Sequence, residues 1–399
     1  MTTSASQPTS TSTSQPHRWL DRPDQLPELA EALNRAAWVA LDTEANSMFV
    51  YRERMCLLQL NVAGDLWVVD TLALLTAEGW PGLKPATTPP PRSTALDPLR
   101  EALARTDRTL WIHGGEYDCA LLRRDFGLTL GGLWDTQMAG QFLGWEKTNY
   151  GALVERVCAV VLAKGHAQYD WATRPLAAEA LTYAIDDVVH LPFVGEFLRD
   201  ALAAADLVEE HAISCTAVAA TTTEGLFDPA GFWRIKGVRD VAKENLTVLA
   251  ALYVWRDEIA RSEDKPAGRI VNNELLLAVA RQAPISFQHL KRTGMKSWLL
   301  SAYGEDLIEL IRTAKEAPES YPPAARHREV DEAEEKREDR LKDWRRGEAE
   351  KRGVPLLVVL PAKALDHIKR YGAADLASVP QMGPKRLARY GQRLRELAS

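Results

Sequence analysis

Residues 37–70 read AWVALDTEANSMFVYRERMCLLQLNVAGDLWVVD, and this stretch decides the fold. Three short runs within it, at 37–42, 56–60 and 66–70, are rich in Val, Leu and Trp, and turn-like or charged residues separate them. Runs of this length and composition are typical of β-strands. The stretch therefore predicts a meander of three strands.

The segment that follows alternates helical and strand patterns. After a Pro-rich insertion, TTPPPRS at 87–93, come a helical pattern at 97–104, a strand at 110–113, a helix from about residue 116 and a short strand ending at Asp135. Residues from about 150 to 205 are predicted to be mainly helical. This order resembles the ribonuclease H-like fold, which implies an α/β domain with a mixed sheet and helices over both sheet faces.

Beyond about residue 230 the strand patterns end and a repeat begins. Residues 250–281 and 339–370 align without a gap, so that Trp255 falls on Trp344. This self-similarity predicts two copies of one small all-α domain. The predicted organisation is a disordered tail (1–17), an α/β domain (18–210) and two helical domains (235–318 and 328–399).

Composition fits a chain of this kind. With 399 residues, 46% of them hydrophobic, the chain can fill two or three compact domains. Its 4 cysteines form no CxxC pair, which argues against a disulfide framework or a zinc site and favours a reducing cytoplasm. Residues 1–16 lack basic residues and an apolar run, so a secretory signal is not expected. No apolar stretch approaches the roughly 18 residues that a membrane span needs.

Charge is unevenly distributed along the chain. The net charge is −6, yet residues 340–399 contain 14 Lys and Arg against 6 Asp and Glu. A basic appendage on an acidic body is typical of a phosphate-binding surface, although a solvated helical face gives the same composition. A Gly383-Pro384 turn leads into the most basic part. The nucleic-acid contacts predicted there are Lys385, Arg386, Arg389 and Arg393.

Two acidic residues end the first predicted strand. Asp42 and Glu44 stand two apart, and because side chains alternate along a strand, both lie on one face. An Asp-x-Glu pair at a strand end is also compatible with a turn or a helix cap.

A third acidic residue, Asp118, lies in the first part of the helix predicted from residue 116. Alone, this position is equally well explained by stabilisation of the helix dipole. His113 before it and Asp135 after it are interpreted as structural residues: His113 supports the strand end, and Asp135 is a hydrogen-bonded carboxylate.

The last motif is Tyr183-Ala184-Ile185-Asp186-Asp187, within a predicted helix. On a helix surface the residues three and four positions after Tyr183 both lie near it, so Asp186 and Asp187 are both geometrically admissible partners.

Together these motifs resemble the tyrosine-bearing branch of the DEDD superfamily of 3′–5′ exonucleases. Residues around Asp118, at 112–114, 125–128 and 134–136, and the residues Gln168, Asp170, Trp171 and 174–176 before the tyrosine helix, are similar to ribonuclease D in particular. The helical repeats resemble the HRDC domains found at the C-termini of ribonuclease D and of some helicases.

This resemblance implies a site and a reaction. It selects Asp187 over Asp186 and gives the catalytic set Asp42, Glu44, Asp118, Tyr183 and Asp187, with the four carboxylates as ligands. Such oxygen ligands suit two Mg²⁺ or Mn²⁺ ions. By resemblance, Asp42 bridges both ions, and Tyr183 positions the attacking water. One departure is Ala45, where many members of the family carry Phe; Met48 or Phe49 could supply the missing apolar surface.

The function expected from the sequence is thus a 3′–5′ exoribonuclease that acts on RNA 3′ ends, in tRNA or other structured RNA processing or in RNA turnover. The same catalytic residues would serve a 3′–5′ DNA exonuclease in repair, so single-stranded DNA stays open as a substrate. A catalytically silent nucleic-acid-binding scaffold is the third interpretation, which the intact catalytic set disfavours.

Overall fold

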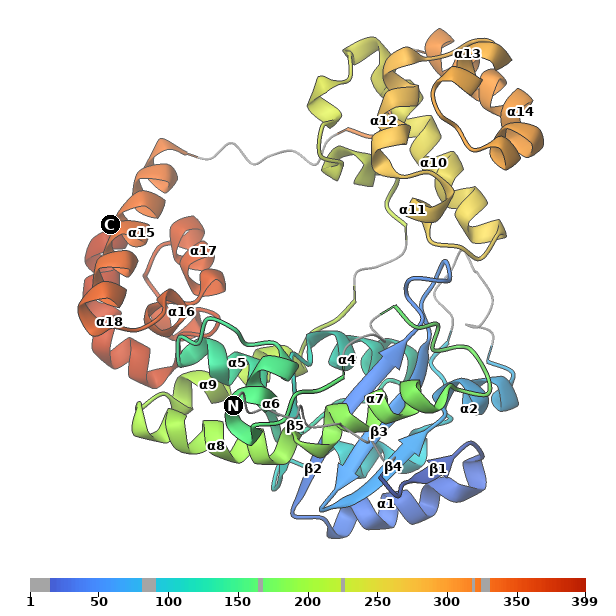
Figure 1. Cartoon of the computed structure of the whole chain (residues 1–399). Helices are drawn as coiled ribbons and strands as arrows, with labels where there is room; N and C mark the ends of the chain where they lie inside the picture. Colours follow the sequence, from blue (N-terminus) through green and yellow to red (C-terminus); the bar gives the residue numbers. More distant parts are fainter. Residues whose placement is uncertain (1–14, 81–90, 164–167, 224–226, 318–319, 324–330) are drawn as a thin grey trace, which may run out of the picture.

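The computed structural model describes residues 15–80, 91–163, 168–223, 227–317, 320–323 and 331–399. Nearly all of the predicted tail, the start of the Pro-rich insertion and the first residues of the second predicted helical domain (328–399) lie outside these residues. The described chain forms an α/β domain followed by two helical units (Figure 1). No helix among the described residues is long and apolar enough to cross a bilayer.

A six-stranded mixed sheet organises the α/β domain, in the order β1-β4-β3-β2-β5-β6. The predicted meander is present: β2 pairs antiparallel with β3, and β3 with β4, whereas β5 and β6 extend the sheet in parallel beside β2. The edge strand β1 was not predicted from the sequence. The strands are β1 (Arg18–Leu20), β2 (Trp38–Ala45), β3 (Met55–Val62), β4 (Asp65–Val69), β5 (Thr109–Ile112) and β6 (Leu133–Asp135).

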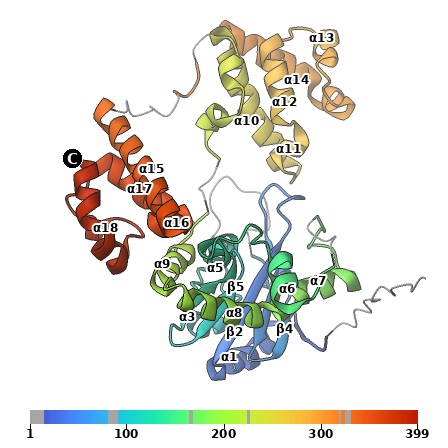
Figure 2. The ribbon, with the colours of Figure 1, turned by 60° about the vertical axis from the view of Figure 1, so that its left-hand side comes forward.

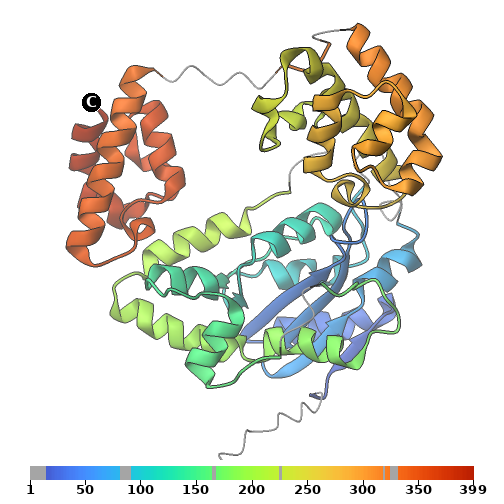
Figure 3. The same ribbon diagram turned by 45° about the horizontal axis from the view of Figure 1, so that its top comes forward.

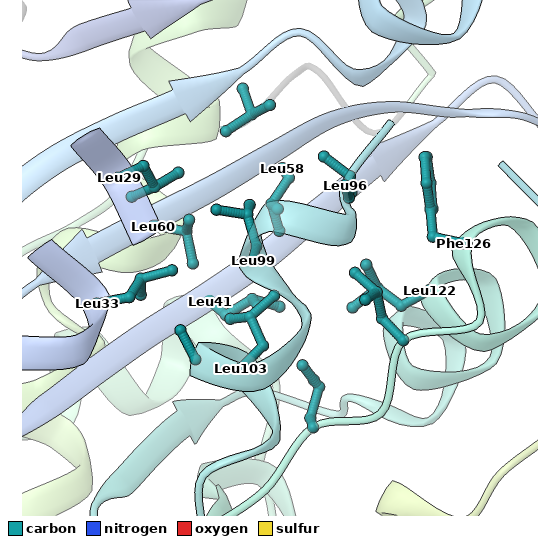
Figure 4. Close-up of a cluster of buried hydrophobic side chains, with 14 of the residues drawn as sticks. Leu29, Leu33, Leu41, Leu58, Leu60, Leu96, Leu99, Leu103, Leu122 and Phe126 are labelled. Atoms are coloured by element: carbon teal, nitrogen blue, oxygen red, sulfur yellow. The ribbon is translucent and has the colours of Figure 1, made fainter. Parts of the chain in front are cut away.

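Helices cover both faces of this sheet, as predicted. They are α1 (Leu26–Arg35), α2 (Thr71–Glu78), α3 (Arg100–Ala104), α4 (Glu116–Leu121), α5 (Thr136–Phe142), α6 (Tyr150–Cys158), α7 (Ala178–Val189), α8 (Leu191–Ala204) and α9 (Val208–Ala219). Helices α1 and α3 pack on the face of Leu41 and Leu60, where a leucine-rich core fills the interior (Figure 4). Helix α7 packs on the opposite face, against Ala40 and Leu57.

Helix α9 shows that the α/β domain extends past the predicted boundary at residue 210. His211 Nε2 lies 2.9 Å from the carbonyl oxygen of Asp135, and the Asp135 N–H donates to Sγ of Cys215 at 3.3 Å. Because α9 is thereby bound to strand β6, a boundary at 210 would cut through a packed helix.

The two helical units are built in a similar way, although among the described residues the first has one α-helix more than the second. The first comprises α10 (Leu246–Ser262), α11 (Ala267–Ile270), α12 (Asn273–Gln282), α13 (Phe287–Arg292) and α14 (Ser297–Glu316); the second comprises α15 (Glu332–Arg352), α16 (Leu356–Val359), α17 (Ala362–Tyr371) and α18 (Gly383–Ala398). The aligned tryptophans make matching contacts: Trp255 packs edge-on against Tyr303, and Trp344 against Tyr390. Equivalent aromatic pairs at nearly the same sequence offset, 89 residues for the tryptophans and 87 for the tyrosines, support the predicted repeat.

Each helical unit contacts the α/β domain at a different place. The first lies over the loop between β2 and β3, which rises toward α11, and the second lies beside α9 (Figure 2, Figure 3). In the second unit, Leu357 and Val358 join a core cluster with Phe142, Leu202 and Leu207 of the α/β domain.

Candidate active site

The end of strand β2 carries the first two predicted residues. Asp42 and Glu44 lie on the face of the sheet covered by α7, because alternation places them with Ala40 of that apolar cluster. The register with β3 shifts between Glu44 and Ala45, and Ala45 is the last paired residue of β2. The two carboxylates thus lie at the end of the strand, beside an irregularity in the sheet.

Helix α7 brings the third carboxylate and the tyrosine to the same place. One carboxylate oxygen from each of Asp42, Glu44 and Asp187 lies within 4.8 Å of the other two. The Tyr183 hydroxyl is hydrogen-bonded to the Asp187 carboxylate one helical turn away. Asp186 is not part of this cluster; burial raises its pKa, and the charge of His190 opposes that rise. Of the two aspartates that helical spacing allowed, Asp187 is the one that joins the cluster.

Asp118 approaches from helix α4 and is held by a residue between the two acids of β2. The Thr43 hydroxyl donates a hydrogen bond to Oδ1 of Asp118. Asp118 is buried, with 6% of its surface exposed, and it raises the pKa of both Asp42 and Glu44 through its charge. It is therefore close to the three-carboxylate cluster without being part of it.

Asp135 fixes the turn that precedes α4. Its carboxylate accepts four backbone N–H groups, from Gly114 and Gly115 at 3.0 Å each and from Gln137 and Met138 at 2.9 and 3.1 Å. This carboxylate caps α5 and also holds the start of α4 in place. The role expected from the sequence, a hydrogen-bonded structural carboxylate, matches this geometry.

His113 also has structural neighbours. Its Nδ1 lies 2.9 Å from the Thr136 hydroxyl, and its ring packs on Tyr150. Burial lowers the pKa of His113 to about 4, which outweighs the opposing effect of Asp135, so the ring is neutral at neutral pH.

Burial and mutual repulsion raise the pKa of every carboxylate in the cluster. Desolvation is the larger cause throughout, and the neighbouring carboxylates add to it. The pKa of Asp42 lies well above its ordinary value, and those of Glu44, Asp187 and Asp118 rise to about 9, about 7 and about 6. Ionised carboxylates this close repel one another, so the cluster is unfavourable without a positive charge. A bound cation would supply that charge.

Burial likewise raises the pKa of Tyr183 further above its ordinary value, and the charges of Asp187, Glu44 and Asp42 reinforce this. The Tyr183 ring packs against Trp171, whose indole is buried. The phenol is thus protonated at neutral pH and held in orientation by an aromatic neighbour.

The sequence interpretation missed three residues that shape this site. Thr43 is the first, and its position opposite Asp42 and Glu44 on an alternating strand was the available signal.

Gln59 is the second. It pairs in register with Asp42 and is fully buried, and neither polar atom of its amide has a hydrogen-bond partner in the described part of the chain. Its signal was an amide inside the apolar run CLLQL at 56–60. Tyr150 is the third, because its hydroxyl donates to the carbonyl oxygen of Asp186 at 3.1 Å and so steadies α7.

Two of the four residues predicted to contact nucleic acid in the C-terminal unit have other roles. Arg386 is 1% exposed and donates hydrogen bonds to the carbonyl oxygens of Leu357, Val358 and Gln381. Lys385 lies at the contact with α9, with Nζ 2.8 Å from Asp206 and 3.4 Å from Glu210.

A carboxylate of α9 binds the start of α18. The Lys385 N–H donates to Oε1 of Glu209 at 2.8 Å, so the helix start binds a carboxylate of this chain rather than presenting free N–H groups. Basic composition concealed this role because buried and exposed arginines look alike in a sequence. Arg389 and Arg393 are exposed, and Arg393 pairs with Glu396.

Comparison with known proteins agrees with the fold. A family model described as 3'-5' exonuclease matches residues 17–203, and the HRDC domain model matches 245–311 and 334–397. Ribonuclease D of Zymomonas mobilis is 31% identical over 306 residues, which cover 74% of this chain and 73% of that protein. The structure of Escherichia coli RNase D superposes with a TM-score of 0.69 at 23% identity, over 96% of this chain and 98% of that one.

Longer proteins match as well. Protein RRP6-like 1 of Arabidopsis thaliana is 26% identical over 321 residues, which are 77% of this chain, and the chain spans about half of that relative's length, 48%. The matched models and the mixed sheet define a DEDD-type 3′–5′ exonuclease domain followed by HRDC domains. Within that class, the chain belongs to the ribonuclease D family.

Proposed function

We propose that the protein is a metal-dependent 3′–5′ exoribonuclease that releases nucleoside 5′-monophosphates from RNA 3′ ends. The observation that carries this proposal is the cluster of Asp42, Glu44 and Asp187, whose oxygens lie within 4.8 Å of one another. Asp118 and Tyr183 stand beside it, so the whole DEDD set with its tyrosine converges from β2, α4 and α7.

The donor set fits divalent cations. Mg²⁺ and Mn²⁺ prefer oxygen ligands, and carboxylates with raised pKa values gain most from a bound positive charge. We assign Asp42, Glu44 and Asp187 to one cation, and Asp42 with Asp118 to a second. Bound divalent cations supply Lewis-acid chemistry: they make water nucleophilic at neutral pH and neutralise charge on the phosphodiester.

Tyr183 is assigned to orienting the attacking water. A phenol has an ordinary pKa of about 10, and the site raises that of Tyr183 further, so Tyr183 cannot accept a proton at neutral pH. Its hydroxyl can hold a water in line with the terminal phosphodiester while Asp187 accepts its hydrogen bond. Trp171 behind the ring limits how far Tyr183 swings.

RNA is the proposed substrate because of the family. The Escherichia coli relative is described as an exoribonuclease involved in structured RNA processing. We propose RNA 3′ ends of that kind, such as tRNA precursors, for this chain, and Mg²⁺ or Mn²⁺ as cofactor. The free cysteines fit a reducing compartment, and we propose the cytoplasm.

Matched single-stranded RNA and DNA of one sequence, each labelled at the 3′ end, separate the two nucleic-acid substrates. We expect labelled mononucleotide to be released from RNA in the presence of Mg²⁺ or Mn²⁺ and not with a chelator. Faster release from DNA would instead establish a DNA exonuclease, and release that persists with a chelator would exclude the metal site.

A further inference from the structure

The first HRDC unit exposes aromatic and basic side chains together. Residues 285–298 contain no acidic residue. Within them Phe287 and Trp298 are 44% and 39% exposed, and Lys291, Arg292 and Lys296 are exposed as well. Exposed aromatic faces beside cations are the groups that bind single-stranded nucleic acid.

These side chains continue toward the active site. The Lys265 ammonium lies 5.5 Å from the centre of the Trp298 ring, and Lys296 Nζ donates to the carbonyl oxygen of Arg269. The Arg269 guanidinium in turn lies over the ring of Phe49, 5.1 Å from its centre. Phe49 is five residues after Glu44, so the two backbones are at most about 17 Å apart.

We call Phe49, Lys265, Arg269, Lys296 and Trp298 the HRDC1 strip. Two contacts anchor it to the catalytic domain. The Tyr51 hydroxyl donates to the carboxylate of Asp257 at 2.8 Å, and Arg54 pairs with Asp264 at 2.7 Å. Both contacts join the β2–β3 loop to the first HRDC unit. Figure 1 shows this loop rising toward α11 of that unit.

The same contacts neutralise two carboxylates near the strip. Asp264 is bound to Arg54 and to the Tyr51 N–H, and Asp257 is bound to Tyr51 and Arg261. Glu263 remains, 3.0 Å from Lys265, and offsets part of that charge. Arg269 and Lys296 are exposed, so both can reach a phosphate.

We propose that the HRDC1 strip binds the single-stranded 3′ segment of RNA as it enters the active site. This inference rests on the exoribonuclease activity proposed above. Aromatic faces stack on bases without regard to sequence, and neighbouring cations follow the phosphate backbone. The strip joins both elements through successive contacts that begin at the loop after the catalytic strand, on a chain whose net charge is −6. The partner is therefore an anionic chain with stackable groups.

Equilibrium binding tests the strip in the full-length protein. The probe is a single-stranded RNA of about 12 nucleotides, in chelator so that no hydrolysis occurs, and affinity is measured over a series of salt concentrations. The variants are Trp298→Ala and the double variant Arg269→Ala with Lys296→Ala. The matched control is Arg312→Ala with Lys315→Ala, which removes two exposed charges from the far end of α14.

We expect Trp298→Ala to weaken binding about tenfold. The double variant should lower the slope of log affinity against log salt by about 1.4, since each single-strand phosphate contact contributes about 0.7. Arg269→Lys with Lys296→Arg should keep the slope, which excludes misfolding as the cause. The control should equal the wild type.

Wild-type affinity and slope in both strip variants would overturn the inference, even where RNA hydrolysis is normal. If the wild type binds RNA through the strip but releases no nucleotide with either metal, the proposed activity fails and the strip stands. The two failures are therefore distinguishable.

Discussion

The Thr43 hydroxyl donates a hydrogen bond to Oδ1 of Asp118 and so joins strand β2 to helix α4 across 75 positions of sequence. Thr43 stands between Asp42 and Glu44, and its side chain lies on the other face of the strand. The end of β2 therefore carries two carboxylates of the site, and its Thr43 positions a third, Asp118, through a hydrogen bond.

Thr43→Val should separate the positioning of Asp118 from its charge. Valine keeps the volume and removes the donor, so we expect kcat to fall by about 10- to 100-fold as Asp118 shifts. The free energy of unfolding should change by only about 1 kcal/mol. Thr43→Ser restores the hydroxyl and should restore kcat. Equal loss of kcat in both variants would show that Thr43 acts through packing rather than through the hydrogen bond.

Asp42→Asn and Asp187→Asn should each abolish nucleotide release while the fold persists. Removing one charge relieves repulsion within the cluster, so the melting temperature in chelator should stay constant or rise. Isothermal titration with Mn²⁺ should show weaker cation binding. Turnover like that of the wild type at saturating Mg²⁺ would remove either residue from the metal site.

Stability of the metal-free protein should fall as pH increases. Unfolded carboxyl groups titrate near pH 4, whereas Asp187 and Glu44 titrate at about 7 and about 9 in the folded chain. Between these values the folded state binds more protons than the unfolded state, so the free energy of unfolding decreases with pH. Melting temperatures in chelator from about pH 5 to about pH 9 measure this decline, and Mg²⁺ or Mn²⁺ should reduce it. Asp42→Asn should flatten it; a matched surface variant, Asp200→Asn, should not.

Tyr183→Phe removes one hydroxyl and no proposed metal ligand. We expect kcat to fall by roughly 10²–10⁴, the range of a positioned acid–base group, with cation affinity retained. Asp186→Asn is the control, and it should be nearly silent because Asp186 lies outside the cluster. A loss of cation affinity as large as that of Asp187→Asn would show that Tyr183 supports the metal site instead.

The second HRDC unit should stabilise the catalytic domain. Deleting residues 331–399 exposes Phe142, Leu202 and Leu207 and leaves Asp206 and Glu210 without Lys385. We therefore expect the melting temperature of the remaining chain to fall and its aggregation to increase. Val358→Asp should reproduce the effect by placing a charge in the same contact, whereas Arg393→Ala, at an exposed position, should not. An unchanged melting temperature after deletion would contradict a stabilising role.

Local patterns carried much of this structure. Alternation along residues 38–45 placed Asp42 and Glu44 on one face. The apolar runs predicted the meander, because a buried strand requires apolar residues close together in the sequence. The tyrosine motif was positioned on a helix, but spacing alone left Asp186 and Asp187 equivalent. Their separation depends on which side of α7 packs on the sheet, and that is a tertiary property.

Contacts between segments that are distant in the chain could not be predicted from the sequence. Arg386 belongs to a basic run, yet it is buried against carbonyl oxygens that the fold brings from residues 357 and 358. Lys385 likewise finds its acidic partners on α9, far away in the chain. A count of Lys and Arg gives the composition only. It does not show which of these side chains are exposed to solvent and which are buried at a contact between domains.

The most direct measurement follows a single-stranded RNA labelled at its 5′ end through time, with the released products identified by mass. In Mg²⁺ or Mn²⁺ the account predicts a ladder that shortens one nucleotide at a time from the 3′ end, with nucleoside 5′-monophosphates as products. The ladder should disappear with a chelator and with Asp42→Asn. Internal fragments, nucleoside 3′-monophosphates, or degradation that continues without metal would contradict it.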